Sequence, residues 1–145
     1  MKPAIPQQLS LFDSPAQRIA TLGRAIKLAL RAAVEASGLS RAEVVYRANE
    51  LAAASGVSMC AGNGALSEAT FNKWLDLKSP GHMPGVVPMN VLCEVLKDLE
   101  VHAVILAVHN REIMTAEDKK FCALGRAYHA NEQARVALKK AKEKI

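Results

Sequence analysis

The sequence predicts an all-α protein, a bundle of five to six helices, and three observations support this fold class. Half of the 145 residues are apolar, while only 4% are aromatic. Alanine is frequent and runs of β-branched residues are scarce, which favours helices over sheets. Apolar residues also recur at steps of three and four, which is the period of an amphipathic helix. The length suits one core with an extended arm.

Three segments are expected along the chain. Residues 1–14 contain Pro3 and Pro6 and have no helical period, so they are predicted to form a flexible N-terminal arm. Residues 15–112 are predicted to form the helical domain. Residues 113–145 are predicted to form a long, basic C-terminal helix.

The first two helices have clear boundary signals. An apolar stripe runs from Ala16 to Ser37 and stops at Gly38, while charged residues such as Lys27 lie mostly elsewhere on the helical wheel. Ser40 then reads as an N-cap, and Glu43, three residues later, completes a predicted capping box. The second helix is expected to run to about residue 54 and to end at the Ser-Gly pair that follows.

A glycine-rich loop, GVSMCAGNGA, leads to a short third helix. Ser67 is its predicted cap, and Phe71, Trp74 and Leu75 form its apolar face. The segment LKSPGHMPGVVP contains three prolines and two glycines and is expected to be a connector. A fourth helix is predicted to begin near Pro88.

The last third of the sequence contains one ambiguous segment and one clear helix. Residues 101–109 are apolar enough for a short helix or a strand, and we favour the helix. Thr115 and Asp118 form a second predicted cap, which opens a helix to about residue 143. Its apolar side can pack on its own domain, pair with a second copy or project as a basic rod. That side contains Phe121, Leu124, Tyr128, Ala134 and Leu138, with Asn131 interrupting it.

The order of these elements resembles the lambda-repressor-like (Cro/C1, XRE-type) helix-turn-helix family. The strings that carry the resemblance are IKLALRAAVEASGLSRAEVVYRAN, LSEATFNKWLD and VPMNVLCEVLKDLEV, within residues 19–101. The chain departs from the family between Ser40 and Ser67, where about 16 extra residues replace the tight turn. The resemblance implies an expanded helix-turn-helix, double-stranded DNA as the partner, a homodimer, and a phage or prophage regulator of transcription.

The resemblance also implies that the third helix reads DNA. Asn72 can pair with adenine, Lys73 can reach guanine or phosphate, and Glu68 can accept a hydrogen bond from cytosine. The helix N-terminus and its hydroxyl groups suit phosphate. The alternative is that Ser67 only caps the helix and that the charged residues are only solvated. The predicted DNA-binding residues are Ser67, Glu68, Ala69, Thr70, Asn72, Lys73, Lys78 and His82.

The distribution of charge agrees with a polyanionic partner, although it is also common in other proteins. The formal net charge is +5, and the positive excess lies in residues 1–40 and 116–145, while residues 80–115 are acidic.

The arm contains a second motif, QLSLF, which resembles the peptide by which bacterial polymerases and repair factors bind the replicative sliding clamp. In such peptides glutamine enters one pocket, while leucine and phenylalanine fill an apolar one. The partner-binding residues would be Gln8, Leu9, Leu11 and Phe12. The alternative to clamp binding is an arm that folds back onto the domain. The alternative to a DNA-binding regulator is a protein-interaction adaptor without base readout, for example one that binds the sliding clamp through this arm.

Other function classes lack support in the sequence. Cys60, Cys93 and Cys122 form no CxxC pair, and the histidines are scattered, so neither disulfides nor a metal or other cofactor is expected. No phosphate-binding loop, nucleophile elbow or Cys-His signature occurs, so the chain is not expected to be an enzyme. No apolar stretch approaches the roughly 20 residues of a membrane span, and the first residues lack a signal peptide. We expect no membrane partner and a cytoplasmic location.

Overall fold

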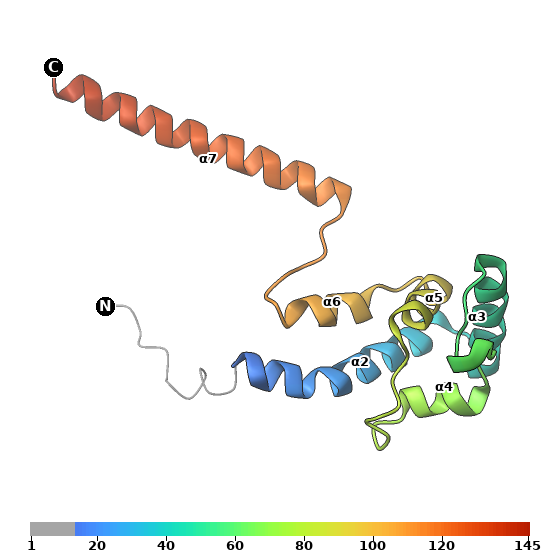
Figure 1. Ribbon diagram of the computed structural model, residues 1–145. Coiled ribbons are helices and arrows are strands. Elements are labelled where there is room, and N and C mark those ends of the chain that lie inside the picture. The colour runs from blue at the N-terminus through green and yellow to red at the C-terminus, as the bar shows by residue number, and fades with distance from the viewer. Residues whose placement is uncertain (1–13) are drawn as a thin grey trace. The chain divides into compact units, whose positions relative to one another are not determined.

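The computed structural model describes residues 14–145, and within them it contains six α-helices, one 3₁₀ turn and no β-strand (Figure 1). The predicted all-α class is therefore confirmed. The chain separates into two compact units, one ending at Glu112 and the other comprising Ile113–Ile145. The helices are α2 (Pro15–Ser37), α3 (Arg41–Ser55), α4 (Glu68–Leu75), α5 (Val86–Leu96), α6 (Glu100–Ala107) and α7 (Ala116–Glu143), with the turn η1 at Ala61–Asn63.

The first unit is a helical bundle around one apolar core. Helix α2 packs along α6, α3 packs against α5 and α4, and α2 also contacts α4 and α5. Val44 of α3, Phe71 of α4 and Leu92 of α5 are each fully buried. The short helix α4 is therefore held by the two longest helices of this unit.

Local caps set the ends of α2 and α3. The Ser14 hydroxyl accepts a hydrogen bond from the Gln17 N–H at 3.2 Å, and the Ser40 hydroxyl accepts one from the Glu43 N–H at 3.1 Å. Gly38 ends α2 with φ +69°, a left-handed conformation that suits glycine. The capping box predicted at Ser40 is only half formed, because the Glu43 carboxylate pairs with the Arg47 guanidinium at 2.9 Å.

The inserted segment between α3 and α4 is a closed loop. It contains an antiparallel bridge between Cys60 and Gly64 that encloses η1. The Asn49 side chain clamps the end of the loop, because its Nδ2 donates to the Leu66 carbonyl at 2.9 Å and its Oδ1 accepts from the Leu66 N–H at 2.8 Å. The chain is thereby returned to α3 just before Ser67 begins α4.

Two boundary predictions in the following segment had different outcomes. Helix α5 begins at Val86, two residues before the predicted Pro88. Proline is tolerated in the first turn because its missing N–H would have no acceptor within the helix. The helix favoured for residues 101–109 is confirmed as α6, and the strand alternative is wrong.

The second unit contains one helix, α7, which opens with the predicted cap. The Thr115 hydroxyl accepts from the Asp118 N–H at 3.0 Å, and the Asp118 carboxylate accepts from the Thr115 N–H at 2.9 Å. No residue of α7 is buried. Within residues 14–145 no helix has the length and apolar character needed to cross a membrane.

Candidate nucleic-acid interface

Helix α4 has a buried face and an outward face, as its sequence predicts. Phe71, Trp74 and Leu75 are buried in the core. The Ser67 hydroxyl accepts from the Thr70 N–H at 3.1 Å and donates to the Thr70 hydroxyl at 3.0 Å, so both hydroxyl groups serve the cap. The cap fixes where the helix begins and hence which residues point outward.

Four of the predicted DNA-binding residues lie on the outward side of α4. Glu68, Ala69 and Lys73 are exposed, and Asn72 is half-buried. Glu68 is next to Asn72 on the surface of α4, and Ala69 is next to Lys73, because residues four apart on a helix are neighbours. The structure thus brings one carboxylate, one amide and one ammonium group together on a solvent-facing surface.

The C-terminal end of α4 is anchored by Lys27, which sequence analysis had placed off the apolar stripe. Lys27 is 1% exposed. Its Nζ donates to the carbonyl oxygens of Lys73 at 2.9 Å, Trp74 at 3.2 Å and His82 at 2.7 Å. Burial lowers the pKa of the Lys27 ammonium group, and the nearby Asp76 carboxylate opposes this shift. The prediction failed because the carbonyls of Lys73 and Trp74, at the negative end of α4, and that of His82, in the connector, satisfy a charge that the helical wheel assigns to solvent.

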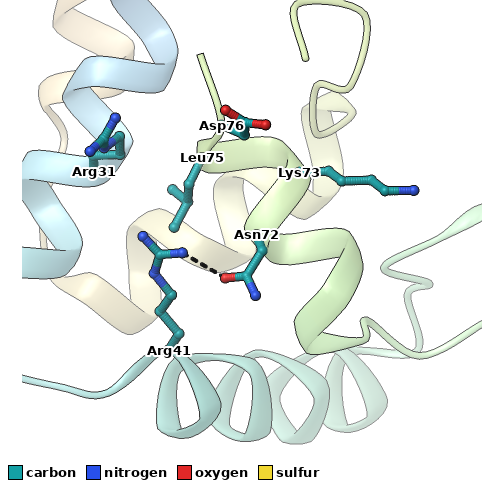
Figure 2. Close-up of a pocket in the computed structure, with 6 residues that line it drawn as sticks. All are labelled: Arg31, Arg41, Asn72, Lys73, Leu75 and Asp76. Atoms are coloured by element: carbon teal, nitrogen blue, oxygen red, sulfur yellow. Dashed lines mark hydrogen bonds between the residues drawn. The ribbon is translucent and has the colours of Figure 1, made fainter. Parts of the chain in front are cut away.

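A cleft of about 430 Å³ lies beside the outward face of α4 (Figure 2). Arg31 reaches it from α2, Arg41 from the first residue of α3, and Asn72 and Lys73 from α4. Leu75 and Asp76 complete its lining. Arg31 and Arg41 are not among the DNA-binding residues predicted from the sequence. Two features of the sequence could have indicated them. Arg31 lies one helical turn after Lys27, and Arg41 directly follows the cap Ser40.

Arg41 and Asn72 contact each other directly across the cleft. Arg41 Nη1 donates to Asn72 Oδ1 at 2.7 Å (Figure 2). A bidentate contact with adenine uses both the oxygen and the nitrogen of an asparagine amide. Because the oxygen of Asn72 is engaged by Arg41, the amide orients a guanidinium group and leaves Nδ2 as the group for an external acceptor.

The cleft is cationic. Arg31, Arg41 and Lys73 contribute three positive charges, and Asp76 contributes one negative charge. The Asp76 carboxylate accepts from the Lys78 N–H at 2.9 Å and from the Ser79 hydroxyl at 3.2 Å. These hydrogen bonds, the one from the Lys78 backbone first, lower the pKa of Asp76. The Asp76 carboxylate is therefore occupied by hydrogen bonds within the turn that follows α4.

The remaining predicted contacts lie outside the cleft. Lys78 and His82 are exposed on the connector after α4, and the His82 carbonyl is held by Lys27. Neither side chain lines the cleft. The predicted clamp-binding residues Gln8, Leu9, Leu11 and Phe12 lie outside the described residues.

Within residues 14–145, no group of three histidine, cysteine, aspartate or glutamate side chains is placed to hold a metal ion. Comparisons with protein-family models, curated proteins and solved structures found no significant match.

Proposed function

We propose that this chain binds double-stranded DNA and reads its sequence through α4, as a bacterial or phage regulator of transcription. The observation that carries the proposal is the cationic cleft formed by Arg31, Arg41 and Lys73 beside the outward face of α4. Regulators of this kind combine positive groups that hold phosphates with polar groups that contact base edges. Both kinds of group occur here within one surface.

The roles of the cleft residues follow from their contacts. Arg41 uses one donor on Asn72 and keeps four of the five N–H donors that a guanidinium carries. Arg31 pairs with no carboxylate among the described residues. We therefore assign both arginines to phosphate contacts. Asn72 positions Arg41 and presents Nδ2 towards the bases.

The outward residues of α4 supply the reading functions. Lys73 is exposed and can donate to guanine or to phosphate, and Glu68 can accept from the amino group of cytosine. Glu68 repels phosphate, so the proposal requires that it face the groove floor rather than the backbone. Reading through α4 also suits a homodimer, because two copies can occupy two half-sites.

The phosphate contacts are tested by measuring binding to random duplex DNA across a salt series by fluorescence anisotropy. Each phosphate contact contributes about 0.9 to the slope of log K against log salt. Arg31→Ala with Arg41→Ala should therefore reduce the slope by about 1.8. Arg47→Ala is the matched control, because Arg47 lies on α3 but pairs with Glu43. No binding by the wild type at low salt would overturn the proposal.

Sequence reading is tested separately, on a duplex selected from a random pool. Asn72→Ala with Lys73→Ala should cost about 1–3 kcal/mol per altered base contact and relax preference at those positions. The affinity for random DNA should fall less. An equal loss on selected and random duplexes would mean that α4 binds the backbone and does not read bases.

The QLSLF motif supports a second candidate function, an adaptor that binds the bacterial sliding clamp. Deleting residues 1–14 should abolish capture by purified clamp and leave DNA binding unchanged. If capture persists without these residues, the adaptor function has no basis in the motif.

A further inference from the structure

Helix α7 carries an apolar stripe that nothing within its unit covers. The unit Ile113–Ile145 contains no other helix. Phe121 is 64% exposed, Leu124 67%, Tyr128 70% and Leu138 58%. Residues 121, 124, 128, 131, 135, 138 and 142 follow each other at alternating steps of three and four, the spacing of a two-helix coiled coil. A helix of 28 residues with this spacing and no buried side chain is suited to a partner helix.

We propose that α7 pairs with α7 of a second copy of this chain, in antiparallel orientation. The pairing is symmetric about the point between His129 and Ala130. In this register Phe121 packs on Leu138 of the second copy, and Leu124 packs on the aliphatic stem of Arg135. Each of these contacts occurs twice in the dimer, because the two-fold axis repeats it.

Charge selects the antiparallel orientation. The first turn of α7 contains Glu117 and Asp118, whereas residues 139–144 contain four lysines and one glutamate. A parallel pair sets the two lysine-rich ends beside each other. An antiparallel pair separates the two lysine-rich ends and sets each beside residues 117–120 of the other copy, where Glu117 and Asp118 balance Lys119 and Lys120. Glu117 is level with Lys142. The repulsion between two lysine-rich ends therefore disfavours the parallel pair.

The uncharged polar residue at the middle of the stripe determines the register, whereas Arg135 and Lys142 contribute aliphatic stems to it. Asn131 is level with Tyr128 of the second copy, so an amide and a phenol group can hydrogen-bond across the interface. A polar residue at a core position of a coiled coil specifies alignment at some cost in stability. Ala127 and Ala134 flank this layer on each helix and allow the two backbones to approach closely.

This inference deepens the proposed function, because the pairing would join two DNA-binding units in one particle. Its tests use the full chain without DNA, so failure of the pairing is distinguishable from failure of DNA binding.

The first test measures the mass of the full chain by sedimentation equilibrium over a dilution series. The wild type should form two-chain particles that dissociate on dilution. Leu124→Asp with Leu138→Asp should give single chains at all concentrations. The control, Ala123→Asp with Val136→Asp, places the same charges on α7 outside the stripe and should remain dimeric. A monomeric wild type, or dissociation in both variants while circular dichroism shows retained helix, would overturn the pairing.

The second test measures orientation by electron-spin resonance between labels introduced by Lys144→Cys, with Cys60→Ser and Cys122→Ser. Cys93 is buried, and burial raises the pKa of its thiol, so it stays unlabelled. In the antiparallel register the labels are 29 residues apart along the axis, about 43 Å at 1.5 Å per residue. A label separation below about 25 Å corresponds to level residues in a parallel pair and would overturn the orientation.

Discussion

Helices α4 and α7 are stabilised in opposite ways. Helix α4 has eight residues, too few to persist alone, and it depends on Phe71 and Trp74 in the core and on Lys27 at its C-terminal end. Helix α7 has 28 residues, carries its own capping box and buries no side chain. Helix α4 is therefore fixed by residues distant in the sequence, which suits a surface that must be held rigidly. Helix α7 is specified by its own residues and leaves its apolar side for association.

The largest effect expected from this comparison concerns Phe71 of α4 and Phe121 of α7. Phe71→Ala should lower the free energy of unfolding by about 3–5 kcal/mol, because it leaves a cavity in the core. Phe121→Ala should change it by less than about 0.5 kcal/mol in dilute protein, because the side chain is exposed. Urea unfolding is followed by circular dichroism, which reports on the helices of both units, and by the fluorescence of Trp74, the one tryptophan of the chain, which reports on the first unit. Equal effects would contradict the contrast between the helices.

A smaller effect is expected from Lys27. Lys27→Met keeps the aliphatic stem but removes a donor from three carbonyl groups, of which only that of Lys73 keeps a second donor, the Asp76 N–H. We expect a loss of about 2–4 kcal/mol in the free energy of unfolding, since each unsatisfied buried group costs about 1–3 kcal/mol. Arg31→Met, one turn further along α2, is the control and should cost less than about 1 kcal/mol, because Arg31 is only half-buried. A stable Lys27→Met protein would show that α4 does not need this anchor.

The smallest effect concerns pH and the first turn of α7. Hydrogen bonds from Thr115, the side chain first, lower the pKa of Asp118. A lowered pKa in the folded helix means that the cap stabilises fully above the ordinary aspartate value and is lost as pH falls through the lowered value. The Thr115 amide resonance should therefore shift in acid, with a midpoint below 3.8. Asp118→Asn should remove this shift, and a midpoint at or above 3.8 would contradict the cap.

The sequence was sufficient for the parts of the fold that depend on neighbouring residues. The serine and threonine caps at Ser40, Ser67 and Thr115 were predicted because a cap satisfies N–H groups two or three residues away. The buried face of α4 followed from its period. These features involve one turn of helix at a time, so a single sequence contains all the information that they require.

The candidate site was only partly predictable, because its decisive contacts join distant segments. Arg41 and Asn72 are 31 residues apart, and Lys27 reaches carbonyls 46 to 55 residues further on. A helical wheel shows which residues of one helix share a face, and it contains no information about a partner from a distant segment. The outward residues of α4 were selected from the sequence, but the arginines of the cleft were identified only when α2, α3 and α4 were brought together.

The two hydrogen bonds between Asn49 and Leu66 fix the C-terminal end of the inserted segment against α3. Because one side chain fixes where the segment ends, residues 57–65 form an excursion whose two ends are tied to α3. Doubling the length of a flexible loop costs only about 0.6 kcal/mol in closure entropy. The exposed turn η1 within the excursion is therefore a natural place for a graft: an epitope or a fluorescent reporter inserted there can leave Met59 in the core and the helix that begins at Glu68 in place.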